Sequence, residues 1–273
     1  MIVQLPSRCY DELWWAETRM MPEAQIATSR EQVALGNPSY VWRAGQDRRL
    51  ELIRRYVSLD NARMLDIGCG IGTYVRKLGE LSSRVYGIDI DPARVHRSES
   101  GALAAAVSER LPFASASFDV VLLNEVIEHV QDDAATLREA CRVVRPGGHV
   151  VVYAPNRLYP FETHGVYLGK RYVFGNIPFV NYLPDMLRRR LVPHARAYTA
   201  RGLRRLVAAL PAEVVVHTQL YPGFDNIAAR SRKLGGLLRT VCYRMESTAL
   251  RAFGISHFIV LRTQEDGREG DDD

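Results

Sequence analysis

Three glycines stand at alternate positions in the stretch MLDIGCGIGTY, at residues 68, 70 and 72. Glycine has no Cβ, so such a stretch can turn sharply and let a ligand lie directly against the main chain. The stretch follows an apolar run and precedes a helix-like pattern, which is the point where parallel α/β sheets bind nucleotides. For a glycine cluster taken alone, a tight turn that serves only packing is the simpler alternative.

An acid further along the chain favours the ligand site. Asp89 ends the apolar segment VYGID, 21 residues after Gly68. At this position an acid can accept hydrogen bonds from the two ribose hydroxyls of a nucleoside. The dinucleotide fingerprint GxGxxG does not fit, because its third glycine would fall at Thr73 or at Val75. The pattern GxGxG therefore predicts a nucleoside pocket of another kind.

Three residues are candidates for acid–base catalysis. His129 lies in EVIEHV, and Glu162 and His164 lie in the aromatic segment YPFETHG. An imidazole titrates near neutral pH, so it could take a proton from a reacting hydroxyl. Ordinary packing and loop hydrogen bonding are the alternatives for all three, and His194 and Tyr198 are weaker candidates.

The sequence predicts no metal site. Asp132 and Asp133 could hold Mg²⁺, but they also begin a predicted helix, where acids cap free N–H groups. The cysteines lack CxxC spacing, so neither zinc nor a disulfide framework is expected. They are Cys9, Cys69, Cys141 and Cys242. We interpret Cys69, inside the glycine loop, as a small buried residue.

Alternating strand and helix patterns must position these residues. Strands separated by single helices predict right-handed βαβ units and a doubly wound, Rossmann-like, mostly parallel seven-stranded sheet. Its ligand site lies at the carboxyl ends of the strands. The predicted strands are 62–68, 84–90, 101–108, 117–126, 149–156, 213–221 and 257–263, and the predicted helices are 72–81, 91–99, 132–144 and 199–210.

Four segments carry a resemblance to a known family. MLDIGCGIGTY, VYGIDID, ERLPFASASFDVVLLNEVIEHV and LREACRVVRPGGHVVVYAPN resemble successive motifs of class I S-adenosylmethionine-dependent methyltransferases. Within that family they are most similar to the small-molecule branch that includes quinone-biosynthesis methyltransferases, over about residues 62–156. The resemblance implies methyl transfer from S-adenosylmethionine to a small-molecule or lipid-like acceptor, through oxygen. An RNA-modifying methyltransferase and a catalytically silent S-adenosylmethionine-binding module are the alternatives.

The resemblance also implies which residues bind the cofactor. Asp66 and the glycine loop would hold its methionine end, and Asp89 its ribose hydroxyls. Many relatives carry Asp where this chain has Val107, so backbone groups would contact the adenine edge. The implied cofactor-binding residues are Asp66, Gly68, Cys69, Gly70, Gly72, Asp89, Ile90 beside the adenine, Ser108 and Glu109 at the adenine edge, and Asn124 near the sulfonium. Methyl transfer itself is a displacement that requires no metal, and it needs a base only if the acceptor loses a proton.

Basic residues gather in two segments of the second half. Residues 168–205 contain nine Lys/Arg and one acid, and residues 230–251 contain six and one. In the first, LPDMLRRRLVP predicts a short helix with Arg188–Arg190 opposite its apolar face, which holds Leu183, Met186, Leu187 and Leu191. Such segments fit an anionic membrane surface or a lipid-like substrate, and a substrate lid with solvated arginines is the alternative. Arginines with interleaved aromatic residues also permit nucleic acid, but no RNA-binding module accompanies them, so nucleic acid is not the expected partner.

We predict three parts in the chain. Residues 1–58 form an N-terminal helical cap or lid, and residues 59–264 form the methyltransferase domain with a substrate-lid insert at about 157–198. Residues 265–273 form a disordered acidic tail. In the cap, Tyr40 or Arg43 could reach the cofactor carboxylate, and the aromatic residues there are Trp14, Trp15, Tyr40 and Trp42.

Composition is that of a globular protein. Of the 273 residues, 47% are hydrophobic and 25% charged. The longest apolar runs are shorter than the ~20 residues of a membrane-spanning helix, and the N-terminus lacks the pattern of a secretion signal. The sequence therefore predicts a cytoplasmic protein. It leaves membrane association and oligomeric state open.

Overall fold

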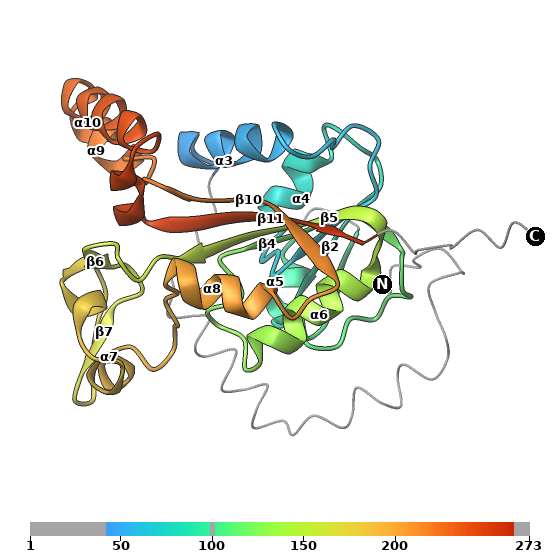
Figure 1. Ribbon diagram of the computed structural model, residues 1–273, viewed down its shortest axis with the longest axis horizontal. Coiled ribbons are helices and arrows are strands. Elements are labelled where there is room, and N and C mark those ends of the chain that lie inside the picture. The colour runs from blue at the N-terminus through green and yellow to red at the C-terminus, as the bar shows by residue number, and fades with distance from the viewer. Residues whose placement is uncertain (1–41, 99–101, 265–273) are drawn as a thin grey trace, which may run out of the picture.

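A seven-stranded sheet forms the centre of the computed structural model, which describes residues 42–98 and 102–264 (Figure 1). The strand order is β10-β11-β5-β4-β1-β2-β3, and β11 runs antiparallel to both of its neighbours. The mostly parallel, doubly wound sheet predicted from the sequence is confirmed. Its strands are β1 (Met64–Ile67), β2 (Val85–Asp89), β3 (Leu103–Ala105), β4 (Phe118–Asn124), β5 (Val144–Pro155), β10 (Ala212–Leu220) and β11 (Ser256–Thr263).

Helices cover both faces of the sheet. α3 (Ala44–Arg54) and α4 (Thr73–Leu78) pack on one face, and α6 (Asp133–Val143) and α8 (Ala200–Val207) pack on the other (Figure 1). Side chains of β4 alternate between the two cores, with Val121 facing α6 and Val120 facing α3. Because both faces are buried, the central strands are continuous apolar runs, which is why they were recognisable in the sequence.

The boundaries of some elements differ from the predictions. β5 begins at Val144, because the RPGG segment that was expected only to stop the preceding helix joins the strand through an irregular register next to β4. β3 is shorter than predicted, since it lies at the sheet edge and pairs only with β2. α5 (Pro92–His96) begins where Asp91 accepts a hydrogen bond from the Ala93 N–H at 3.0 Å, as its capping pattern predicted.

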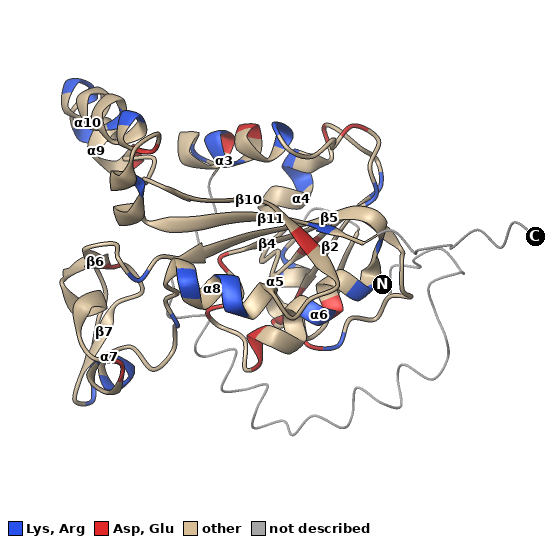
Figure 2. Ribbon diagram, in the orientation of Figure 1, with Lys and Arg blue, Asp and Glu red and all other residues tan. Residues whose placement is uncertain are grey.

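The insert forms a small lobe beside the sheet (Figure 1). Its apolar centre is the cluster of Val166, Val180, Val192 and Ala195. Lys and Arg residues lie on its helix α7 (Asp185–Leu191), and also on α8 and on α10 (Arg232–Met245) (Figure 2). The elements of the lobe are β6 (Phe161–Glu162), β7 (Val166–Leu168), β8 (Arg171–Val173), β9 (Ile177–Pro178), the 3₁₀ turn η2 (Val180–Tyr182) and α7 (Asp185–Leu191). A second projection joins β10 to β11, and it consists of α9 (Asp225–Arg230), α10 (Arg232–Met245) and η3 (Ala249–Phe253).

Arg188 does not lie on a solvated face of α7, so that prediction is wrong. Its side chain is only 3% exposed, whereas the predicted apolar-face residue Met186 is 67% exposed. The guanidinium donates to Glu162 Oε2 at 2.6 Å, to Asn181 Oδ1 at 3.1 Å and to the Ala195 carbonyl at 2.9 Å. These three acceptors make burial of the paired charge possible next to the apolar cluster of the lobe.

The N-terminal part of the chain is described only from Trp42 onward. The Trp42 and Tyr74 rings pack edge to face, with their centroids 4.8 Å apart. The Arg43 guanidinium donates to Asn226 Oδ1 at 3.0 Å. Trp14, Trp15, Tyr40 and the acidic tail at 265–273 lie outside the described residues, so the predicted domain boundaries stay predictions. None of the described helices combines the length and apolarity needed to cross a membrane.

Candidate active site

The carboxyl ends of β1, β2 and β4 are level with one another. β1 pairs in parallel with both neighbours, and Ile67 lies beside Ile88 and Leu123. The residues that follow on the three strands are the glycine loop, Asp89 and Asn124. They therefore emerge at the same edge of the sheet, which is where parallel α/β sheets bind their ligands.

The glycine loop has a backbone that other residues would strain. Gly68, Gly70 and Gly72 have φ angles of 71°, 59° and 81°, all in the left-handed region. At Gly68 a Cβ would also lie 2.6 Å from the side chain of Val126. At Gly70 a Cβ would meet nothing within 4 Å, so this peptide borders open space. The loop can thus present bare backbone to a ligand.

Asp89 joins the glycine loop to the end of β2. Its two carboxylate oxygens accept from the Gly70 N–H and from the Asp91 N–H, both at 2.9 Å. Each oxygen keeps a further lone pair for a hydroxyl donor. Burial raises the pKa of Asp89 although these hydrogen bonds oppose the shift. Burial, and then the charge of Asp89, raise the pKa of Asp66 well above its usual value. Two buried acids so placed favour a ligand that brings hydroxyl groups and positive charge.

The other predicted cofactor residues lie near this edge in supporting positions. Ser108 Oγ donates to Glu109 Oε2 at 3.2 Å and lies 3.1 Å from Thr136 Oγ1. Glu109 Oε1 accepts from the Gln131 N–H at 3.0 Å, so the pair also ties its turn to the start of α6. Ile90 is half-buried. Contacts of these three residues with an adenine ring stay a prediction.

The thiol of Cys69 is not a candidate nucleophile. Its side chain is buried within the loop. Burial, followed by the charges of Asp66 and Asp89, raises the pKa of Cys69 well above its usual value. A thiol that stays protonated is a poor nucleophile, which agrees with its interpretation as a small buried residue.

Arg49 of α3 is a site residue that the sequence analysis missed. Its guanidinium donates to Asn124 Oδ1 at 2.5 Å and to Glu125 Oε1 at 2.7 Å. It also lies 4.6 Å from the centre of the Tyr153 ring, whose hydroxyl donates back to the Arg49 carbonyl at 2.9 Å. These contacts dock α3 on the end of β4. A single arginine in a helix that precedes the sheet carries no motif, so no sequence signal pointed to it.

Glu125 holds an unusual conformation directly after β4. Its φ angle of 57° lies in the left-handed region, which a residue with a side chain seldom adopts. Burial would raise the pKa of Glu125, but the Arg49 guanidinium and a hydrogen bond from the Ser256 hydroxyl outweigh it and lower the pKa. An ionised carboxylate paired with Arg49 is the result. Strained residues of this kind cluster at functional sites.

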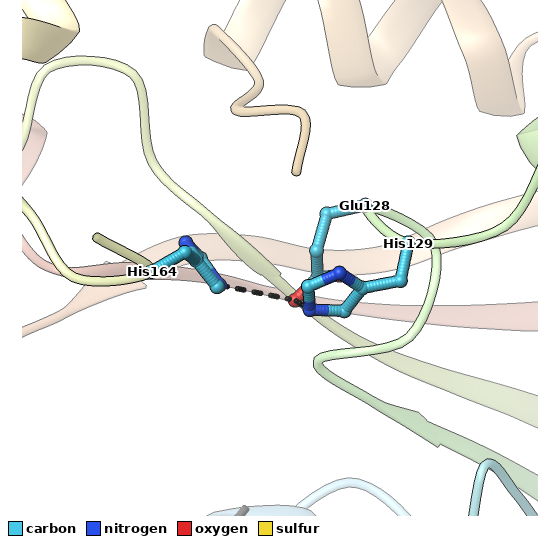
Figure 3. Close-up of side chains that lie close together, drawn as sticks. All are labelled: Glu128, His129 and His164. Carbon is cyan, nitrogen blue, oxygen red and sulfur yellow. Dashed lines mark ion pairs between the residues drawn. The ribbon is translucent and has the colours of Figure 1, made fainter. Parts of the chain in front are cut away.

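Beyond Glu125, a carboxyl group and two imidazoles converge (Figure 3). Glu128 Oε1 lies 3.9 Å from His129 Nε2 and 3.9 Å from His164 Nε2. The centroids of the two imidazole rings are 5.2 Å apart, and the ring planes are inclined to each other at 76°. Burial, and then the charge of Glu125, raise the pKa of Glu128 well above its usual value. Burial lowers the pKa of His129 to about 4, so its imidazole is neutral at physiological pH.

Of the predicted catalytic residues, the structure brings His129 and His164 together and gives Glu162 a supporting position. Glu162 Oε1 accepts from His164 Nδ1 at 2.8 Å, while its Oε2 accepts from Arg188. Burial would raise the pKa of Glu162, but His164 and Arg188 lower it to about 2. Glu162 therefore orients His164 and has no free oxygen facing the cluster. The His194 backbone carbonyl accepts from His129 Nδ1 at 3.0 Å, and His194 Nε2 lies 2.9 Å from the backbone carbonyl oxygen of His164.

The remaining candidates are structural. The Tyr198 hydroxyl donates to the Ile127 carbonyl and to Asp133 Oδ2, each at 2.9 Å. Asp132 caps α6 by accepting from the Ala135 N–H at 2.8 Å, which confirms the capping role. Tyr198, Asp132 and Asp133 thus each have a hydrogen-bonding partner within the fold.

Comparisons with known proteins agree on the domain. Residues 65–152 match a family model described as a methyltransferase domain. Relatives include the ubiquinone biosynthesis O-methyltransferase of Aromatoleum aromaticum, 34% identical over 139 residues that cover 48% of this chain and 59% of the relative. Another is the enzyme of the same name from Xylella fastidiosa, 36% identical over 118 residues that cover 40% and 48%. The chain thus spans about half the length of the curated relatives it matches.

Solved structures share the fold. An S-adenosylmethionine-dependent methyltransferase from Mesorhizobium loti aligns with a TM-score of 0.55 at 18% identity, covering 78% of this chain and 96% of that one. The cyclase SpnF aligns with a TM-score of 0.53 at 18% identity, covering 84% and 85%. At these identities the likeness concerns the fold, and one fold carries many chemistries.

The contacts of Arg188 predict how the insert responds to mutation. Arg188→Ala leaves Glu162 as a buried charge with half of its partners removed, so the lobe should lose about 3 kcal/mol or more of its stability. Hydrogen exchange in peptides from residues 157–198 will measure this as faster exchange. The matched control is Arg189→Ala, an exposed neighbour, whose effect should stay within about 0.5 kcal/mol. Equal protection in the two variants would show that the Arg188 contacts do not stabilise the lobe.

Proposed function

Residues 65–152 are a methyltransferase domain of the S-adenosylmethionine-dependent class, and we propose that the whole chain uses it to methylate an oxygen atom of a small, lipid-like acceptor. One observation carries this proposal. The glycine loop, Asp89 and Asn124 end level at one edge of the sheet, and the cluster of Glu128 and two histidines begins only a few residues after Asn124. A donor site and a site for a protic acceptor are therefore neighbours.

The donor would be held by backbone and by acids. The open peptide at Gly70 suits the methionine portion, and the spare lone pairs of Asp89 suit the two ribose hydroxyls. The positive sulfonium and ammonium groups would offset the unfavourable burial of Asp66. Because Arg49 is neutralised by Glu125, its guanidinium adds little repulsion toward a cationic ligand beside Asn124.

The acceptor would be positioned by the buried cluster. Displacement at a sulfonium requires the acceptor oxygen to approach the methyl carbon to about 3–3.5 Å in line with the breaking bond, with water excluded. The side chains of His129 and His164 are each 12% exposed, so an acceptor reaching them is largely shielded. A hydroxyl placed there must lose its proton as the methyl group arrives, and the neutral imidazole of His129 can accept it.

The lipid-like character of the acceptor is inferred from two observations. The relatives named above are ubiquinone biosynthesis O-methyltransferases. In this chain, the lobe that supplies His164 exposes apolar side chains that ordinarily lie in a core, including Leu168 at 60%, Phe179 at 65% and Met186 at 67%. Both support an acceptor with a hydrocarbon portion, presented to the cluster past this lobe.

The proposal is tested by labelling. The protein is incubated with radiolabelled methyl donor and host extract separated into lipid, small-molecule and RNA fractions. Label is expected in the lipid or small-molecule fraction. Label in RNA would favour the RNA-modifying alternative, and the absence of label from every fraction would favour a silent binding module. Base-stable attachment of the label is expected for an ether, and base-labile attachment would argue for an ester.

Donor binding gives a second prediction. Asp89→Ala should weaken affinity for S-adenosylhomocysteine by roughly 10- to 100-fold, because hydrogen bonds to a charged group contribute about 1.5–3 kcal/mol. Isothermal calorimetry will measure the affinity. The matched control is Asp91→Ala, two residues on, which caps α5 and should change affinity less than about 3-fold. Unchanged affinity in Asp89→Ala, with far-UV circular dichroism intact, would remove the donor site assigned here.

We also propose that the lobe contacts an anionic membrane surface. The exposed arginines on α7 are Arg189 and Arg190, whereas Arg188 is buried and must be left intact in the test. Changing both exposed arginines to alanine should weaken binding to phosphatidylserine vesicles by roughly 30-fold, at about 1 kcal/mol for each charge. The control changes Arg54, the last residue of α3, and Arg55, which follows it; both are exposed, and the change should leave sedimentation unchanged. Equal binding by all three proteins would refute the membrane role of α7.

A further inference from the structure

We propose that Glu128, His129 and His164 bind a divalent transition-metal ion through one carboxylate oxygen and two Nε2 atoms. The donor atoms of the three residues all lie within 4.8 Å of one another (Figure 3). Methyl transfer from a sulfonium does not itself require a metal, so this site goes beyond the proposed function. The sequence analysis predicted no metal, because His164 is 35 residues away from His129 and only the folded lobe brings it back.

The distances suit an ion placed between the groups better than direct contact. Each Nε2 lies 3.9 Å from the same Glu128 oxygen, too far for a hydrogen bond, which spans about 2.7–3.2 Å. In a tetrahedral site with metal–ligand bonds of about 2.0–2.2 Å, neighbouring ligand atoms are roughly 3.3–3.6 Å apart. The two distances to Glu128 exceed this range by a few tenths of an ångström, whereas the widest separation in the set, up to 4.8 Å, would have to shorten by roughly 1.2–1.5 Å through rotation of the side chains.

In each of the two histidine rings, the contact made by Nδ1 leaves Nε2 as the nitrogen that can bind a metal. His164 Nδ1 lies 2.8 Å from Glu162 Oε1, and a carboxylate oxygen can only accept, so Nδ1 carries the proton. His129 Nδ1 lies 3.0 Å from the His194 carbonyl oxygen and carries its proton for the same reason. Whenever such a ring is neutral, its Nε2 therefore has a lone pair, and in both rings Nε2 lies on the side of Glu128. A histidine bonded through its other nitrogen to a carboxylate or carbonyl is the usual outer arrangement of metal-binding imidazoles.

The Glu128 carboxyl gives an independent observation. It is 2% exposed, and neither of its oxygens makes a hydrogen bond of normal geometry among the described residues, although the neighbouring Glu125 carboxyl lies close enough to raise the pKa of Glu128. Buried polar atoms are nearly always paired, because an unpaired one loses the hydrogen bonds it made to water. The arginine whose charge acts on Glu128 is Arg49, and its guanidinium donates to Asn124 and Glu125 instead. A cation among the three groups would satisfy the orphaned carboxylate.

The ligand chemistry selects the class of ion. Two imidazoles and a carboxylate suit Zn²⁺, Fe²⁺, Co²⁺ or Ni²⁺, whereas Mg²⁺ and Ca²⁺ prefer ligand sets made of oxygen alone. Three protein ligands leave at least one position for water or for an acceptor oxygen. If the proposed function holds, an acceptor hydroxyl bound there would have a lower pKa, and the histidines would serve as ligands. That role depends on the proposed function, whereas binding of the ion does not.

Cobalt(II) is the probe for the test. Chelator-treated full-length protein is titrated with Co²⁺, and its visible d–d absorption reports the number of ions and their coordination. One ion per chain is expected, with a spectrum typical of four- or five-coordinate nitrogen and oxygen ligands. His164→Ala and Glu128→Gln should each weaken binding by about 10-fold or more, since each removes a ligand. The matched control is His96→Ala, an exposed histidine at the end of α5, which should not change binding.

Binding of S-adenosylhomocysteine separates this proposal from the preceding one. Each variant should keep the wild-type affinity for that compound, which also shows that it is folded. His164→Gln replaces the alanine variant if the latter fails this check. No specific Co²⁺ spectrum from the folded wild-type protein, or the same spectrum and affinity in the ligand variants, would overturn the metal site. A specific spectrum without affinity for S-adenosylhomocysteine would support the metal site while the proposed function fails.

Discussion

Parallel pairing of β1 with both β2 and β4 is the constraint on which the rest of the site depends. The register ends the three strands together, so a loop, an acid and an amide that are far apart in sequence leave the sheet at one edge. Asp89 reinforces the arrangement by accepting the Gly70 N–H. A slip of one residue in either pairing would turn Asp89 or Asn124 to the opposite face and disperse the site.

Several buried charged residues lie around this edge of the sheet. Two arginines among them connect neighbouring elements through ion pairs. Arg49 fastens α3 to the end of β4 through Asn124 and Glu125. Arg188 fastens α7 to Glu162, which in turn orients His164. A buried ion pair with well-placed hydrogen bonds adds little net stability over apolar packing, but it specifies one arrangement. Here the arrangement it specifies presents two imidazole nitrogens to Glu128.

The match to the methyltransferase family model covers only some of the residues that form the site. The matched methyltransferase domain spans residues 65–152 and contains the glycine loop, Asp89 and Asn124. The groups that complete the other side of the site lie outside that range, in α3, in the lobe and at the start of β11. They include Arg49, His164, Arg188 and Ser256. The matched range therefore contains the proposed donor residues together with Glu128 and His129, whereas His164, which completes the cluster, lies in a segment outside it.

The sequence by itself determined the features that depend on residues close together in the chain. Strand and helix periods predicted the sheet, and the spacing of three glycines and Asp89 predicted the donor site, because each is a local pattern. Only the tertiary structure decided which distant groups meet. Arg188 looks like a solvated arginine in its helix, and it is buried because acceptors from three other segments surround it. His164 joins His129 for the same reason: the contact follows from how the lobe packs, and no local pattern encodes it.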